Sequence, residues 1–174
     1  MRLRLATESD LDPILALVRG VVPLMRASGN FQWSESYPNR EIFARDLSLG
    51  QLWVAVCQSA DQENIAGVAA LTQDQSPEYA QVGWNLDEPA MVVHRMAVDP
   101  RWRGQGVARQ LMQQAERVAR ESGIALLRVD TNAENGAMQR LIVSLGYAFS
   151  GAFAFDSRPG LRFYAYEKRT TASA

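Results

Sequence analysis

The sequence has very little cysteine and histidine, and each shortage excludes a class of site. Its only cysteine, Cys57, leaves no partner for an intramolecular disulfide and too few thiolates for a cysteine-based zinc cluster. Its only histidine, His94, excludes a metal site built from several histidines. Long apolar runs are also missing, since the longest covers only residues 65–71, and the N-terminus lacks the apolar core of a signal peptide. We therefore expect a soluble, cytoplasmic protein without a metal ion or a membrane anchor.

Positive charge is absent from one long stretch of the chain. Between Asp46 and His94 there is no lysine or arginine, although the stretch contains seven acidic residues. Residues 95–109, by contrast, contain four arginines and a single acid around a glycine-rich turn, which predicts an anionic ligand there. The acidic stretch is either an ordinary solvated surface or an attraction for a cationic partner. The overall net charge of −1 argues against binding to nucleic acid.

Length and composition indicate one globular domain over residues 1–174, because 47% of the residues are hydrophobic and 21% are charged. The spacing of the apolar residues predicts the order of the elements. Helices are expected from Thr7 to a kink or end at Pro23, from the cap Asn39 to about Leu49, after Asp99-Pro100 as far as Gly123, and over Glu134–Leu145. Strands are expected over 2–5, 52–57, 65–72, 79–84, 91–98, 124–130, 147–155 and 161–167, with a hairpin turn at 59–64. This order is typical of a mixed α/β or α+β sheet.

The glycine turn carries the strongest functional signal. It lies between a predicted strand and a predicted helix, where the free N–H groups of the helix start and the helix dipole favour an anion. No Gly-Lys-Ser/Thr is present, which excludes a Walker loop, and Arg109 stands where a Rossmann loop needs its third glycine. The remaining pattern is Arg-x-x-Gly-x-Ala, formed by Arg103, Gly106 and Ala108.

Together with the strand end Met96–Pro100, this turn resembles the acetyl-CoA loop of the GCN5-related N-acetyltransferase (GNAT) family. The resemblance continues through the strand Leu127–Thr131 and the helix-opening Asn135, and ends at the pair Gly146-Tyr147. It is strong over residues 91–155, which would form the acetyl-CoA motif core of a single acyl-CoA N-acyltransferase domain. It implies a mostly antiparallel twisted sheet, splayed between its fourth and fifth strands and flanked by about four helices.

The resemblance implies acetyl-CoA as cosubstrate and direct transfer of the acetyl group to an amine, without a covalent enzyme intermediate. The backbone of Met96, Ala97 and Val98 would pair with the pantetheine arm, and one of their N–H groups would polarise the thioester carbonyl. Asn135 would hydrogen-bond the pantetheine or its phosphate end, and Arg101 or Arg103 would reach the remaining phosphate. The amides that would hold the pyrophosphate are those of Gly104, Gln105, Gly106, Val107, Ala108 and Arg109.

An amine with a pKa of about 10 is mostly protonated at neutral pH, so a proton acceptor is expected. His94 precedes Val98 by four residues, and strand alternation would place it on the face of Met96 and Val98. Some arylalkylamine acetyltransferases carry a histidine at the matching position for this purpose, although a lone strand histidine is more often structural. Glu88 or Glu35, acting through water, is an alternative, and so is the absence of a dedicated base.

The group that would protonate the departing thiolate is missing from its usual position. Many family members have a tyrosine seven residues after the asparagine, whereas this chain has Ile142, which cannot donate a proton. Either Ser144, Tyr147 or Tyr164 takes this role, or the thiolate leaves unassisted. A thiol pKa of about 8.5 makes unassisted departure feasible.

Aromatic residues occur in the segments where the family builds its acceptor pocket. They are Phe31, Trp33, Tyr37 and Trp84, with the acids Glu35, Asp87 and Glu88 nearby in the sequence. Aromatic rings and carboxylates suit a cationic amine, so we expect a small-molecule amine acceptor, with ordinary core packing of these rings as the alternative. Two other functions stay open, a CoA-binding sensor without turnover and an acetyltransferase for protein or peptide amines. A homodimer is one option for the oligomeric state.

Overall fold

Segments rich in apolar and β-branched residues pair into one open sheet. The structure, a computed structural model, describes residues 1–59 and 62–170. Within these residues the sheet has seven strands in the order β1-β2-β3-β4-β5-β7-β6. The strands are β1 (Arg2–Leu5), β2 (Leu52–Ser59), β3 (Gln62–Thr72), β4 (Ala90–Val98), β5 (Leu126–Asn132), β6 (Ala148–Phe153) and β7 (Phe163–Arg169). Because β2 and β3 extend further than expected, the predicted hairpin turn is shorter, and its tip at 60–61 lies outside the described residues.

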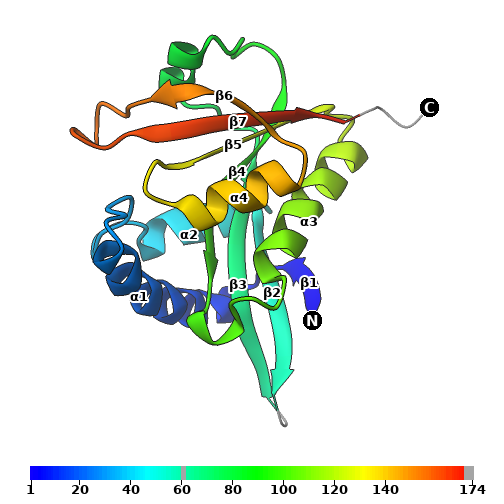
Figure 1. Ribbon diagram of the computed structural model, residues 1–174. Coiled ribbons are helices and arrows are strands. Elements are labelled where there is room, and N and C mark those ends of the chain that lie inside the picture. The colour runs from blue at the N-terminus through cyan, green and yellow to red at the C-terminus, as the bar shows by residue number, and fades with distance from the viewer. Residues whose placement is uncertain (60–61, 171–174) are drawn as a thin grey trace.

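Helices cover both faces of this sheet. On one face, α1 (Leu11–Ala27) and α2 (Arg40–Ser48) pack against β2, β3 and β4. On the other face, α3 (Val107–Glu121) and α4 (Gly136–Ser144) pack against the central strands. In Figure 1 the strands β5, β6 and β7 lie across the top while β2 and β3 run downward, so the two halves of the sheet diverge. The mixed α/β fold predicted from the sequence is therefore confirmed.

The divergence begins at the centre of the sheet, where β4 leaves β5. These strands pair in parallel only from Ala90 with Leu126 to Val93 with Val129, while the other strand pairs are antiparallel. Beyond that point β4 has a β-bulge, since the register with β3 passes from Ala70–His94 to Val68–Ala97, which leaves Arg95 and Met96 opposite one residue. The predicted splay between the fourth and fifth strands is thus present.

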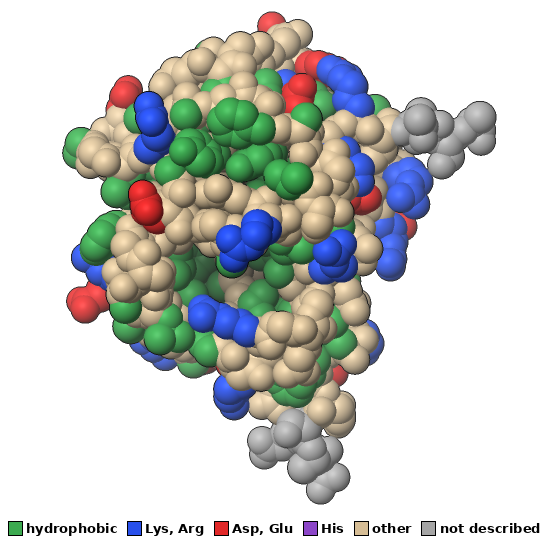
Figure 2. All heavy atoms as spheres, viewed as in Figure 1, with side chains coloured by type: hydrophobic (Ala, Val, Ile, Leu, Met, Phe, Trp, Pro, Cys, Tyr) green, Lys and Arg blue, Asp and Glu red, His purple; other side chains and the backbone are tan. Residues whose placement is uncertain are grey.

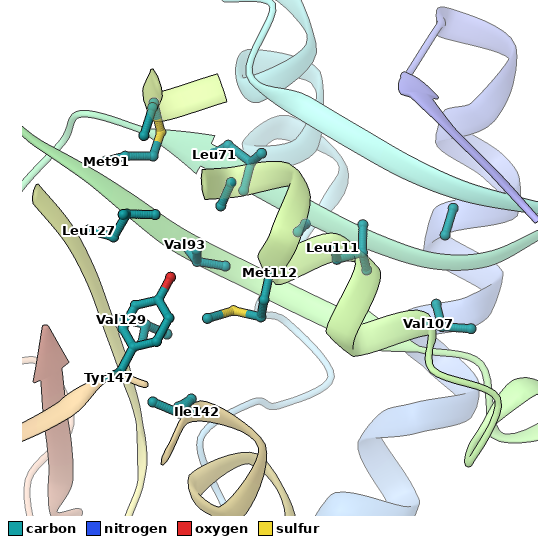
Figure 3. Packing of buried hydrophobic residues seen from close by; sticks show 14 of the residues in the cluster. Leu71, Met91, Val93, Val107, Leu111, Met112, Leu127, Val129, Ile142 and Tyr147 are labelled. Atoms are coloured by element: carbon teal, nitrogen blue, oxygen red, sulfur yellow. The ribbon is translucent and has the colours of Figure 1, made fainter. Parts of the chain in front are cut away.

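Close packing against a glycine positions the start of α3. The stripe that includes Val107 and Leu111 is buried against the sheet, as Figure 3 shows. A Cβ added at Gly67 of β3 would lie 2.7 Å from Cγ1 of Val107 and 3.1 Å from the carbonyl oxygen of Ala97. The first turn of α3 therefore sits directly on β3, which brings the preceding loop beside the end of β4.

Caps start the first two helices largely as predicted. The N–H of Thr7 donates to Asp10 at 2.7 Å, but one turn of 3₁₀ helix, η1 (Glu8–Asp10), precedes α1. The Asn39 side chain accepts a hydrogen bond from the N–H of Ile42 and caps α2. The helix α1 continues to Ala27, so Pro23 does not end it.

The prediction of a strand at residues 79–84 is wrong. Residues Pro77–Val82 form a 3₁₀ helix, η2, which begins at a proline and ends at Gly83 in the left-handed conformation, with φ of 77°. The fully buried ring of Tyr79 packs edge-on against Trp84 and Phe153, with centroid distances of 5.0 and 5.4 Å. Burial of this single ring, rather than strand pairing, determines the local conformation.

Within residues 1–59 and 62–170, no helix combines the length and apolarity required to cross a membrane. No group of three or more His, Cys, Asp and Glu side chains in the same ranges could hold a metal ion.

Candidate functional site

The gap between β4 and β5 opens into a cavity of about 590 Å³. Its walls come from the end of α1 and the loop after it, the last half of β4, the loop before α3, the end of β5 and the start of α4. Figure 2 shows the molecule hollowed between α1, α3 and α4, with apolar side chains inside and basic side chains at the rim. The splay of the sheet therefore produces a site open to ligands.

An ion pair holds the bulge that creates this gap. Arg95 has a positive φ of 51°, which is uncommon for a residue with a side chain. Its guanidinium donates two hydrogen bonds, of 2.6 and 2.8 Å, to the carboxylate of Asp46 on α2. Both side chains are largely buried, at 15% and 6% exposure. The strained strand conformation is thus tied to the helix packed beneath it.

The bulge also changes which face each residue of β4 occupies. Met96 and Val98 pack on the α3 side of the sheet, as Val93 does, while Ala97 packs on the α1 side. Because His94 follows Val93 in a regular part of the strand, it points to the opposite side. The sequence analysis predicted from strand alternation that His94 shares the face of Met96 and Val98. This prediction is wrong, because the bulge adds one residue to β4 and so reverses the face of every residue after it.

The glycine turn presents open backbone to the cavity. Gly104 and Gly106 have φ of 75° and 80°, and no atom lies within 4 Å of the position of a Cβ at either. Gly106 is the N-cap of α3, whose first N–H groups have no partner within the helix. Arg103, Gly104 and Ala108 line the cavity. The Val107 side chain is in the core, so only its backbone is available to a ligand, and this geometry fits an anion such as a pyrophosphate.

The arginines around the turn have different partners. Arg101 does not line the cavity and forms an ion pair of 2.7 Å with Asp99, whose pKa is lowered by the hydrogen bonds from Arg101. Arg109 donates to the hydroxyl of Ser144 at 2.9 Å, and the Gln105 side chain donates to the Arg101 carbonyl. Of the two arginines predicted to reach a phosphate, Arg103 is the one at the cavity wall.

Asn135 lines the cavity and also has a local role. Its Oδ1 accepts from the N–H of Met138 at 3.3 Å and caps α4, and its Nδ2 donates to the Thr131 hydroxyl at 3.1 Å. One hydrogen of the amide group is left for a ligand. The backbone residues Met96, Ala97 and Val98, predicted to pair with a pantetheine arm, line the same cavity.

The predicted proton acceptors lie outside the cavity wall. His94 Nε2 is 3.0 Å from the carbonyl oxygen of Asp74, and since a carbonyl only accepts, Nε2 carries the hydrogen. Burial lowers the pKa of His94. Glu88 pairs with Arg169 at 2.7 Å, which lowers the pKa of Glu88. Glu35 is exposed on the loop between α1 and α2.

The candidate proton donors Ser144, Tyr147 and Tyr164 do not line the cavity. Ile142 is fully buried in the core beside Met112 and Tyr147 (Figure 3). Burial raises the pKa of Tyr147, and its hydroxyl has no hydrogen-bond partner. The Ser144 hydroxyl donates to the Leu141 carbonyl, and Tyr164 packs against Phe149.

The aromatic residues predicted to form the acceptor pocket do not lie together. Trp33 is buried and lines the cavity. The guanidinium of Arg158 stacks on the ring of Tyr37, with its Cζ 4.5 Å from the ring centroid. The guanidinium of Arg128 stacks on Trp84 at the same distance, 4.5 Å. Phe31 is exposed at the surface. Trp33 is thus the one of the four that meets the cavity.

Asp130 is a cavity residue that the sequence analysis missed. It lies on β5 just past the point where β4 departs, and its carboxylate accepts a hydrogen bond of 2.5 Å from the Tyr79 hydroxyl. Burial raises the pKa of Asp130, although His94 and the Tyr79 hydrogen bond oppose the increase. An acid inside a central strand, next to the buried Val129, is the signal that could have identified it.

Comparisons with known proteins agree with this geometry. The family model described as the acetyltransferase (GNAT) family matches residues 20–147. The "Uncharacterized N-acetyltransferase YesJ" of Bacillus subtilis is 28% identical over 169 residues, covering 96% of this chain and 89% of that protein. A GNAT-family acetyltransferase structure from Streptococcus agalactiae matches with a TM-score of 0.81 at 26% identity, covering 98% and 95% of the two chains. The structure of yncA from Salmonella typhimurium, a putative acetyltransferase solved with acetyl-CoA, shares the fold, with a TM-score of 0.69 at 18% identity, covering 99% and 95%.

Proposed function

Because the chain belongs to the GNAT family of acetyltransferases, we propose that it transfers an acetyl group from acetyl-CoA to the amine of a small molecule. The observation that carries the proposal is the continuous cavity from the left-handed glycine turn to the gap between β4 and β5. The acetyl-CoA complex of the Salmonella neighbour supports the choice of cosubstrate.

The residues along the cavity fit an elongated anionic thioester. The open amides from Gly104 to Arg109 would hold the pyrophosphate, with Arg103 beside it. The free half of the Asn135 amide would bind the pantetheine arm, which lies along the unpaired edge of Met96–Val98. An N–H of this edge would donate to the thioester oxygen and stabilise the charge that develops there.

The transfer itself is a direct attack of the neutral amine on the thioester carbonyl. A base first takes one proton from the ammonium form to give the neutral amine. The C–N bond then forms as the C–S bond breaks, and the nitrogen gives one further proton to the departing thiolate. A thiolate with a conjugate-acid pKa of about 8.5 is a fair leaving group, so no acid from this chain is required. Trp33 and the end of α1 would enclose the acceptor.

Two measurements on the intact protein test this function. Calorimetry with acetyl-CoA measures binding, and a free-thiol assay over a panel of amines, amino acids and peptides measures turnover. We expect micromolar to millimolar binding together with amine-dependent thiol release. Binding without thiol release over the whole panel would instead indicate a CoA-binding sensor, and release with peptides alone would indicate a protein acceptor.

A matched pair of variants tests the cavity. Ala108 lines the cavity in the first turn of α3, whereas Gln113 is exposed on the same helix. Ala108→Leu should weaken acetyl-CoA binding at least tenfold by filling the site, and Gln113→Leu should leave it unchanged. Equal affinity of both variants would contradict the assignment of the cavity to the cosubstrate.

A further inference from the structure

Two acidic side chains, Asp130 and Glu134, line the cavity among the described residues, and they differ in environment. Glu134 is exposed in the turn that precedes α4. Asp130 is partly buried on β5, at the point where the β4–β5 pairing has just ended. Only Asp130 therefore places a carboxylate inside the gap, next to the open edge of β4.

A rigid aromatic cluster holds the Asp130 carboxylate. The hydroxyl of Tyr79 donates to Oδ2 at 2.5 Å, and the ring of Tyr79 is fully buried against Trp84 and Phe153. A carboxylate has about four acceptor sites, of which this bond uses one. The remaining sites are available to a donor that enters the cavity.

Among the described residues, no cation forms a direct ion pair with the Asp130 carboxylate. Arg95 is paired with Asp46. Arg158 interacts with Asp130 electrostatically and lowers its pKa, but its guanidinium donates to the Gln32 carbonyl and stacks on Tyr37. His94 on β4 also faces Asp130, and its Nε2 donates to a backbone carbonyl. A partly buried carboxylate without a direct counter-ion is unfavourable, and a cationic ligand would relieve this cost.

We propose that Asp130 binds the ammonium group of the acceptor and accepts one of its protons, while Tyr79 positions the carboxylate. This inference rests on the proposed acetyl transfer and assigns to Asp130 the role that the sequence offered to His94 and Glu88. The ammonium gives one proton to the carboxylate, and the neutral amine then attacks the thioester carbon. The second proton leaves with the thiolate as the amide forms, and Asp130 returns its proton to solvent.

The single histidine provides a binding test that does not depend on turnover. His94 interacts electrostatically with Asp130 and gives the only histidine signal in an NMR spectrum of the protein. We expect benzylamine, butylamine and 1,4-diaminobutane to shift this signal saturably, and benzyl alcohol to shift it much less. Asp130→Asn should weaken the amine effect at least tenfold, whereas Glu121→Gln, at an exposed acid of α3 that does not line the cavity, should preserve it. An unchanged amine titration in Asp130→Asn, or no saturable shift with any of the amines in the unmodified protein, would overturn the assignment.

Kinetics test the proton transfer separately. We expect Asp130→Asn to lower kcat/KM for amines about 10²–10⁴-fold at neutral pH and to make the rate rise with pH as free amine accumulates. Tyr79→Phe removes a hydrogen bond that lowers the pKa of Asp130, so the acidic limb of its pH profile should move to higher pH. Thiol release with an unchanged pH profile in both variants would reject Asp130 while leaving the acetyltransferase assignment intact. If the unmodified protein does not bind acetyl-CoA, the proposed function is rejected. The binding of amines to Asp130 is then still decided by the NMR test.

Discussion

At the scale of single residues, Arg95 has the largest structural consequence. A non-glycine residue at positive φ costs about 1–3 kcal/mol, so the surroundings must hold it in place. The buried, bidentate pair with Asp46 does this, and the resulting bulge separates β4 from β5. One side chain on one helix thus maintains the opening in which the cosubstrate would bind.

Removing this pair should be costly. Arg95→Ala leaves Asp46 buried without a partner and should lower the free energy of unfolding by about 3–5 kcal/mol, measured by urea denaturation. Arg40→Ala, which breaks the exposed pair between Arg40 and Asp12, serves as the control and should cost at most about 1 kcal/mol. Similar losses in the two variants would contradict the role of burial.

Asp130 should reduce stability at neutral pH. Its pKa is raised in the folded state, so it contributes stability below the unfolded-state pKa of about 3.9, and this contribution is lost as pH rises through the folded-state value. Asp130→Asn should therefore raise Tm at pH 7, by about 2–4 °C for each kcal/mol, and have little effect near pH 3.5. Thermal melts at both pH values check this, and a lower Tm at pH 7 would contradict it.

At the scale of elements, the position of α3 depends on the missing side chain of Gly67. The helix start carries the amides that would hold the pyrophosphate, and its first turn rests on β3 at this residue. The affinity for the cosubstrate should thus respond to a substitution on a strand that does not line the cavity.

Gly67→Ala tests this dependence. The added methyl group must displace Val107 or the Ala97 carbonyl, so we expect a loss of about 1–3 kcal/mol in stability and weaker acetyl-CoA binding by calorimetry. Gly20→Ala on α1 is the matched control, because no atom lies within 4 Å of its Cβ position. It should stabilise the helix by about 0.5–1 kcal/mol. Unchanged acetyl-CoA affinity in Gly67→Ala would contradict the claim that cosubstrate binding depends on the position of α3.

At the scale of the whole molecule, the fold redistributes the charges of the sequence. Several acids of the stretch between Asp46 and His94 pair with arginines from outside it, as Asp46 does with Arg95, Glu63 with Arg2 and Glu88 with Arg169. The prediction that this stretch as a unit attracts a cation is therefore weakened, and the attraction is better assigned to Asp130 within the cavity.

We propose that residues 1–174 act as one domain, since a single sheet contains both β1 and β7, the first and last strands described. Calorimetric unfolding should then show one cooperative transition. CoA at about one hundred times its dissociation constant should stabilise the fold by about 2.7 kcal/mol and raise Tm by roughly 5–10 °C. Two transitions, of which CoA shifts only one, would contradict a single domain.

The sequence by itself determined the family, the order of most elements and the glycine turn, because these depend on local rules. Left-handed glycines, the Asn39 cap and apolar periodicity act over a few residues and can be recognised in the chain. The family predicted from residues 91–155 is confirmed by the family model, which matches residues 20–147. The remaining features required contacts between distant residues.

Only the tertiary structure decided which polar residues reach the cavity. The bulge depends on a pair separated by 49 residues, and the Tyr79–Asp130 hydrogen bond joins residues separated by 51. Strand alternation failed at His94 because the bulge adds a residue, and the segment of Tyr79 became a 3₁₀ helix because burial of its ring outweighed strand propensity. Local patterns contain no information on such long-range contacts, and in this protein those contacts place Asp130 in the cavity and His94 behind it.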